Sequence, residues 1–152
     1  NKEIVDLYQA LSGLNLKGVK FAYAVAKNIN LLKPEIDAID EAQKPREDYI
    51  AYNTERVELA KKHSEKDEKG KPVIEGRNFK IADDEAFEKE WDELKAKHAD
   101  AIAYREQQDK EFEDLMNKES TVVLHKVSLK EVPQEITSQQ LTSVFAIVDD
   151  SE

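Results

Sequence analysis

Three histidines and three short acidic runs are the residues of this chain whose chemistry could support a site. His63, His98 and His125 lie far apart, and none belongs to an HxxxH or HExxH spacing. A zinc site needs three or four converging ligands, so structural or surface roles suit these histidines better. The acidic runs lack the spaced ligands and central glycine of a calcium loop; they lie at 67–68, 83–85 and 149–150. We therefore expect no metal site.

The sequence also lacks the motifs of covalent catalysis and phosphate binding. It has no Cys, so a thiol nucleophile, a thiolate metal site and a disulfide framework are all excluded. Gly70 and Gly76 are not followed by the Lys-Ser/Thr pair of a phosphate-binding loop. No Ser, Thr or Lys stands in a recognisable nucleophile context. We expect a protein that is not an enzyme and that uses no cofactor.

Composition favours long helices with one apolar face and one wet face. Charged residues make up 37% and hydrophobic residues 39% of the chain, with only four Gly and four Pro. The length of 152 residues suits a single domain, 1–152. The net charge of −10 argues against direct nucleic-acid binding. No apolar run approaches the roughly 18 residues of a membrane span, and the start lacks the apolar core of a signal peptide. We expect a soluble protein that is not secreted by a signal peptide.

Two series of positions spaced alternately by three and four residues predict two long amphipathic arms. The expected arms, 19–66 and 84–117, should fold back on each other so that facing residue numbers sum to roughly 147. The first series is Ala22, Val25, Ile29, Leu32, Ile36, Ile39, Gln43, Arg46, Ile50, Asn53, Val57 and Ala60. The second is Phe87, Trp91, Leu94, His98, Ala101, Arg105, Gln108, Phe112 and Leu115.

Two prolines interrupt the first arm. An interior proline costs a helix about 3 kcal/mol and one backbone hydrogen bond. The heptad register nevertheless continues through both Pro34 and Pro45. This predicts one bent arm with kinks near the two prolines, and a break into two or three helices is the alternative.

The whole pattern predicts a mainly α fold. Its centre is a long antiparallel helical hairpin, coiled-coil-like, with a β-hairpin at its tip over 72–82. The remaining elements are a short helix over 3–12, a short C-terminal strand over 121–129 and a short C-terminal helix over 138–148. Thr137 and Gln140 match a capping box at the start of the last helix, and Asp83 or Asp84 should cap the second arm.

Two groups of residues are candidates for protein contact. Arg46 and Arg105 fall in one polar layer of the hairpin and should repel each other unless Asp100, Glu106 or a partner intervenes. A single strand over 121–129 cannot stand alone, so it should pair with another copy or with a partner's sheet edge. The candidates in the last two elements are Val123, His125, Val127, Leu141, Val144, Phe145 and Val148.

Three segments carry a resemblance to a known family. They are the helix end and turn KKHSEKDEKGKPVI (61–74), the helix end FEDLMNKE (112–119) followed by a Val-rich strand, and ITSQQL (136–141) before a short apolar helix. Together they resemble a family of small tailed-bacteriophage proteins of unknown function. The resemblance implies a phage protein of the virion or its assembly, found in the host bacterial cytoplasm or in the particle. The architecture is also similar to that of prefoldin.

These observations lead to three hypotheses. The first is a non-enzymatic phage protein that acts by protein–protein interaction, as a virion structural or assembly component, and that self-associates. The second is an inhibitor of a host nucleic-acid-binding or defence protein, acting through 83–119, where fourteen acids against six bases give a net charge of −8. The third is a prefoldin-like chaperone that uses the apolar residues Val73, Ile74 and Phe79. The partner's identity and the oligomer number stay open.

Overall fold

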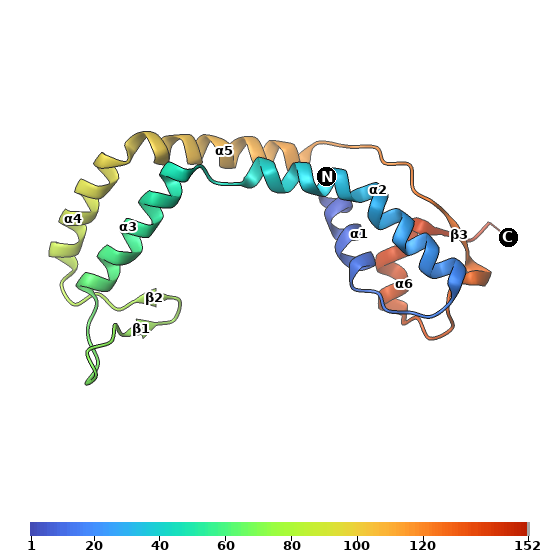
Figure 1. Ribbon diagram of the computed structural model, residues 1–152, viewed down its shortest axis with the longest axis horizontal. Coiled ribbons are helices and arrows are strands. Elements are labelled where there is room, and N and C mark those ends of the chain that lie inside the picture. Colours follow the sequence, from blue (N-terminus) through green and yellow to red (C-terminus); the bar gives the residue numbers. More distant parts are fainter. Residues whose placement is uncertain (152) are drawn as a thin grey trace. The chain divides into compact units, whose positions relative to one another are not determined.

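The structure is mainly helical, which confirms the predicted fold class at that level. The computed structural model describes residues 1–151, and helices make up 66% of it (Figure 1). The α-helices are α1 (Lys2–Ser12), α2 (Val19–Gln43), α3 (Glu47–His63), α4 (Asp84–Lys97), α5 (Ala99–Asn117) and α6 (Ser138–Val144). The short elements are β1 (Ile74–Glu75), β2 (Asn78–Phe79), β3 (Val127–Ser128), β4 (Val148–Asp149) and the 3-10 turns η1 (Leu129–Glu131) and η2 (Phe145–Ile147).

Contacts between residues divide the chain into two compact units, which we describe separately. The terminal unit comprises residues 1–43 together with the residues from 111 onward, and the central unit comprises residues 44–110. One boundary follows the end of α2, and the other lies inside α5. The sequence predicts one domain over 1–152, and the contacts within it form two compact units.

The terminal unit has a continuous apolar core. In α1 the buried residues Ile4, Leu7 and Leu11 follow helical spacing and form the face that packs on α2 and α6 (Figure 1). In α2, Phe21 and Leu32 are fully buried against this face. Burying one such side chain stabilises the fold by about 1.5–3 kcal/mol. The remaining core members are Ala24, Val25, Val127, Val144, Ile147 and Val148.

The last elements of the chain complete this core, and they are shorter than predicted. The capping box at Thr137 and Gln140 is confirmed, since each side chain bonds the backbone of the other residue. The expected helix 138–148 ends earlier, because α6 tightens into η2 and the chain then becomes β4. β4 pairs in parallel with β3, with Val127 opposite Val148 and Ser128 opposite Asp149. The prediction that the C-terminal strand needs a partner outside the chain is therefore wrong.

Most of the expected strand 121–129 is extended chain held by one side chain. Only Val127–Ser128 form a strand. Asn28 of α2, which is fully buried, donates from Nδ2 to the carbonyl oxygen of His125 and accepts from the His125 backbone N–H, both at 2.8 Å. A side-chain amide presents an N–H donor and a C=O acceptor side by side, as a peptide group does, so it takes the place of a neighbouring strand at His125.

The helix continues through Pro34 but is broken at Pro45. Pro34 lies inside α2, which continues through it, whereas the chain leaves the helix at residues 44–46. Proline lacks an N–H and disfavours the helical conformation of the residue before it, which explains the break at Pro45. Arg46 is extended at φ −66° and ψ 156°. The prediction of one arm over 19–66 is therefore wrong at Pro45, and the two helices end at Gln43 and His63.

The central unit contains α3, α4, the first part of α5 and the β1–β2 hairpin (Figure 1). Asp83 caps α4 by accepting a hydrogen bond from the Ala86 N–H at 3.1 Å. The second expected arm, 84–117, is interrupted at His98, whose φ of −110° and ψ of 25° are not helical. The expected β-hairpin 72–82 is present with two-residue strands, and Gly76 takes the positive φ of 65° that its tight turn requires.

Candidate protein-interaction surface

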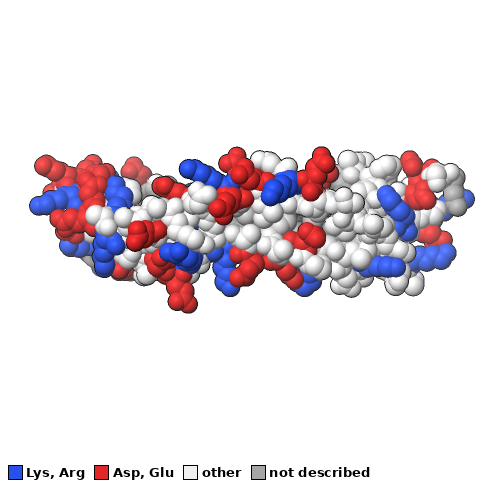
Figure 2. Space-filling model, turned by 90° about the horizontal axis from the view of Figure 1, so that it is seen from above, with Lys and Arg blue, Asp and Glu red and all other residues white. Residues whose placement is uncertain are grey.

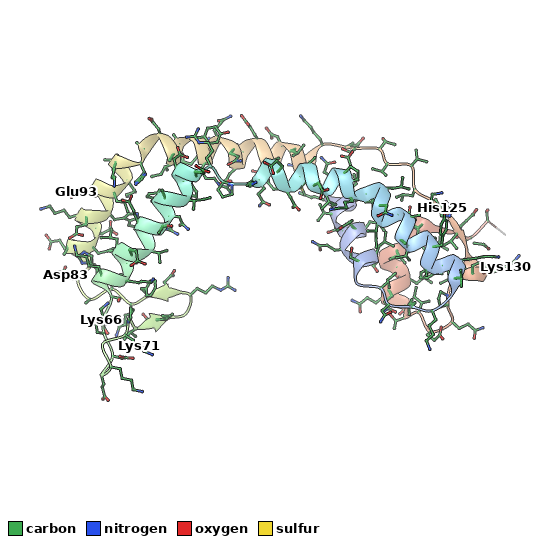
Figure 3. The ribbon with its side chains drawn as sticks, in the orientation of Figure 1. Lys66, Lys71, Asp83, Glu93, His125 and Lys130 are labelled. Carbon is green, nitrogen blue, oxygen red and sulfur yellow. The ribbon has the colours of Figure 1, made fainter. Side chains whose placement is uncertain are left out.

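The contact residues predicted in the terminal unit mostly belong to its own core. Val127, Val144 and Val148 are buried, and Leu141 packs against the same core. His125 lies on the extended segment beside α2, with its ring centroid 5.6 Å from that of Tyr23 (Figure 3). The two exposed candidates are Val123, at 83% exposure, and Phe145, at 47%.

Arg46 and Arg105, which the sequence placed in one polar layer, each pair with an acidic residue of the central unit. Arg46 bonds Asp48 through both Nε and Nη2, and its guanidinium lies 3.8 Å from the ring centroid of Tyr104. Arg105 pairs with Asp109 at 3.0 Å. The bond to Asp48 raises the pKa of Arg46 and lowers the pKa of Asp48, while the charge of Asp100, one of the two predicted intermediaries, acts on Arg46 more weakly. The polar layer is thus satisfied within the chain.

A motif that the sequence analysis missed occurs once in α3 and once at the end of α4. Residues 55–63 read ERVELAKKH and residues 90–98 read EWDELKAKH, so both have the pattern E-x-x-E-L-x-x-K-H. Each position of the second copy follows its equivalent by 35 residues. We call these two segments the duplicated motif. The offset of 35 is a signal readable in the sequence, but a search for ligand spacings within one helix does not detect it.

The structure pairs the two copies of the motif with each other. Lys62 Nζ bonds both carboxylate oxygens of Glu90 at 2.9 and 2.8 Å. In the equivalent contact, Lys97 Nζ bonds the two oxygens of Glu55 at 3.2 and 2.9 Å. These hydrogen bonds from Lys97 and Lys62 are the largest of the effects that lower the pKa of Glu55 and Glu90. The first glutamate of each copy therefore binds the lysine of the other.

The histidines of the motif repeat this exchange. His63 Nε2 lies 3.2 Å from Glu90 Oε2, and His98 Nε2 lies 3.3 Å from Glu55 Oε1. Both Nε2 atoms are shielded from solvent, and neither contact has standard hydrogen-bond geometry, so these are ion pairs when the imidazole is protonated. After the lysines, the imidazoles of His63 and His98 also lower the pKa of Glu90 and of Glu55, respectively.

Aromatic rings cover the two imidazoles in the same reciprocal way. The centroid of Tyr52 in α3 lies 5.5 Å from that of His98, and the centroid of Phe87 in α4 lies 5.9 Å from that of His63. Tyr52 and Phe87 are also 35 residues apart. The paired elements are thus related by a local two-fold pseudosymmetry. Trp91 breaks it, because its Nε1 donates to the Tyr52 hydroxyl at 3.3 Å and residue 56 is an arginine.

The duplicated motif lines an open groove of about 640 Å³ between α3 and α4. Leu59 and Leu94, which are equivalent positions, supply its apolar surface and are partly buried. Glu93 lies on α4 and is exposed (Figure 3). We call this feature the α3–α4 groove. Its lining residues are Thr54, Glu55, Glu58, Leu59, Lys62, Glu90, Glu93, Leu94 and Lys97.

A second groove of about 350 Å³ lies near the β-hairpin of the same unit, and Phe79 helps to line it. Of the other apolar tip residues, Ile74 is 64% exposed and Val73 is partly buried. This groove is smaller than the α3–α4 groove, and the residues that line it are not identical at an offset of 35 residues.

Across the described residues 1–151, His, Asp and Glu side chains nowhere gather in a group of three suited to a metal ion. Within the same range, every helix is too short or too polar to cross a membrane. The side chains of the duplicated motif instead bond one another between elements. Together they place carboxylates, ammonium groups and two leucines at repeated positions along the groove.

No protein-family model, no curated protein and no solved structure matches this chain.

Proposed function

We propose that this protein acts without catalysis, by binding another protein through the α3–α4 face of a long, coiled-coil-like helical hairpin. The observation that carries the proposal is the α3–α4 groove itself. It is open, it has an apolar strip at Leu59 and Leu94, and charged side chains surround that strip at repeated positions. Helix-binding grooves of other proteins combine the same two features.

The thin packing under the groove supports a docking role. Among the described residues, α4 has no buried side chain and α3 has only Tyr52. The ion pairs between them are exposed, and exposed ion pairs contribute little to the stability of a fold because water and salt screen them. A partner bound over Leu59 and Leu94 would bury apolar surface that is partly exposed to solvent in the chain alone.

A place in a phage virion or its assembly follows from the sequence resemblance and remains part of the proposal. Self-association of the chain belongs to the same hypothesis. Neither the virion role nor self-association depends on which face of the chain is used. Identifying the protein that binds the chain distinguishes the two.

The test is affinity capture with the full chain as bait in a lysate of phage-infected bacteria, followed by cross-linking mass spectrometry. We expect phage structural proteins to be retained, with cross-links to lysines 61, 62, 95 and 97 around the groove. A Leu59→Asp, Leu94→Asp variant should lose them, because it places two charges on the apolar strip. Val123→Asp is the matched control, since Val123 is exposed in the terminal unit. Capture that is lost with Val123→Asp and kept with the groove variant would contradict the assignment of this face.

The inhibitor hypothesis has one observation in its favour, the excess of acid around the groove. Four glutamates and two lysines line it. Basic side chains are interspersed with the acidic ones over α4, at the left of Figure 2, which is also typical of an ordinary solvated face. Recovery of a host nuclease, polymerase or defence protein in the capture experiment, lost on charge reversal of residues 83–119, would favour this function over assembly.

A further inference from the structure

The side chains that line the α3–α4 groove are not balanced in charge, since four glutamates face two lysines. Lys62 and Lys97 are already bonded to Glu90 and Glu55 across the helices. Glu58 and Glu93, the second glutamates of the two motif copies, are exposed beside the leucine strip. Lys61 pairs with Glu58 at 2.9 Å, but the residue equivalent to Lys61 in α4 is Ala96. Within residues 1–151, Glu93 has no ion pair. The groove therefore carries excess negative charge around an apolar centre.

We infer that the α3–α4 groove binds a basic amphipathic helix of a protein partner, with apolar side chains on Leu59 and Leu94 and lysine or arginine beside Glu58 and Glu93. This inference rests on the proposed function and specifies its partner. A third helix laid between two packed helices makes a three-helix bundle, which would supply the core that α3 and α4 lack. Arginine or lysine flanking an apolar stripe complements the groove's charge and is common in helices that dock in this way.

Charge also argues against a second copy of the chain as the occupant of the groove. Two copies meeting through this face would bring together two linings that each hold four glutamates against two lysines. Like charges brought together at an interface are costly, because burial removes the water that screens them.

The pseudosymmetry adds one expectation about the bound helix. The glutamate, leucine and lysine positions of the groove exchange when the two motif copies are interchanged. A bound helix therefore meets nearly equivalent side chains in either direction. The groove fixes where the helix lies, and the residues that break the symmetry, Lys61 and Ala96 among them, must fix its direction.

The test uses two synthetic helical peptides about three heptads long, with leucine at the a and d positions. One carries lysine elsewhere and the other glutamate, and binding to the full chain is measured by fluorescence anisotropy at low and physiological salt. We expect the leucine–lysine peptide to bind and the leucine–glutamate peptide not to bind. A Glu58→Gln, Glu93→Gln variant should weaken binding by about threefold to tenfold, because it removes two exposed charge contacts.

The matched control is Glu88→Gln, Glu106→Gln, which removes the same charge from exposed positions that do not line the groove. It should leave the affinity within about twofold, since distant surface charges are screened. Equal weakening by both double variants would show general attraction to an acidic chain and overturn the inference, as would binding of the leucine–glutamate peptide. An unchanged affinity of the Glu58→Gln, Glu93→Gln variant for a captured natural partner would overturn the basic-helix inference while leaving the protein-binding function intact.

Discussion

The helices of the two units are held together by different kinds of contact. In the terminal unit, α1, α2 and α6 surround fully buried side chains such as Leu11, Phe21 and Val144. In the central unit, α3 and α4 are joined by ion pairs, ring contacts and one hydrogen bond from Trp91 to Tyr52. Apolar burial contributes far more per residue than exposed ion pairs do. The terminal unit therefore rests mainly on apolar burial, whereas the central unit leaves the apolar side chains of its groove partly exposed.

This difference also bears on which residues the proposed interaction would use. A buried leucine in the terminal unit already has its apolar surface covered, so it has little left to offer a partner. Leu59 and Leu94 in the central unit are only partly covered, and charged groups at repeated positions lie around them. The proposed binding face thus lies where the helices bury the fewest side chains, a combination that is common at binding sites.

The largest expected effect is the loss of a core side chain in the terminal unit. Leu11→Ala should destabilise the protein by about 2–5 kcal/mol, because Leu11 is fully buried and its removal leaves a cavity. Leu59→Ala, the matched change in the central unit, should cost about 1 kcal/mol or less, since a partly exposed site gives up less apolar contact. Urea denaturation followed by circular dichroism measures both. Equal costs would remove the contrast between the units.

The next effect concerns the buried amide of Asn28. Asn28→Ala leaves the backbone N–H and carbonyl of His125 without the partners that Asn28 provides, and each unsatisfied group costs about 1–3 kcal/mol. We expect a loss of that order together with faster hydrogen exchange at the His125 amide. Asn30→Ala is the control, because Asn30 is an exposed asparagine of the same helix. An unchanged exchange rate at His125 would show that Asn28 does not hold this segment.

Much of the fold can be predicted from the sequence because helical spacing is a local property. The apolar spacing in α1, the cap at Asp83 and the capping box at Thr137 each depend on residues within one or two turns, and all three are present. The prediction of a continuous helix through Pro45 was wrong, because the apolar spacing takes no account of the free energy lost when proline lacks a backbone N–H. The strand over 121–129 failed because its partner is a side chain 97 residues away, which no local pattern reveals.

The candidate site was harder to predict than the fold. Val127, Val144 and Val148 look like contact residues in a sequence because an apolar face does not say what covers it. His63 and His98 look isolated because each one pairs with a glutamate of the other helix, Glu90 or Glu55. Their relation appears only when the chain is compared with itself at an offset of 35 residues. The residue types at the site can be read from the sequence, but which distant residues contact one another cannot.

A smaller expected effect compares the helix caps of the two units. Thr137→Ala and Asp83→Ala each remove a side chain that accepts a hydrogen bond from the first turn of a helix. Each should cost about 1 kcal/mol, the typical value of an N-cap. Thr121→Ala, at an exposed position in the terminal unit, is the control. Thermal unfolding of the three variants measures these costs. A shift for Thr121→Ala as large as that for Thr137→Ala would mean that the cap contributes nothing specific.

The smallest expected effect is a dependence of the central unit on pH. Glu55 and Glu90 have pKa values below the ordinary 4.5, chiefly because Lys97 and Lys62 donate hydrogen bonds to them. A carboxyl whose pKa is lowered by folding stabilises the folded state above its unfolded pKa and loses that contribution as the pH falls through the folded value. The α3–α4 contacts should therefore weaken only below pH 4.5. The single tryptophan, Trp91, lies on α4 and reports on this unit by fluorescence.

Glutamine at both positions separates this effect from general acid unfolding. Glu55→Gln, Glu90→Gln should start slightly less stable at neutral pH and should show a flatter change of Trp91 fluorescence in acid, because glutamine does not titrate. The terminal unit, whose core is apolar, should keep its helical circular dichroism over the same range. A Trp91 transition that is as steep in the double variant as in the parent protein would mean that the two cross-helix pairs do not hold α3 to α4, and that the aromatic contacts alone do so.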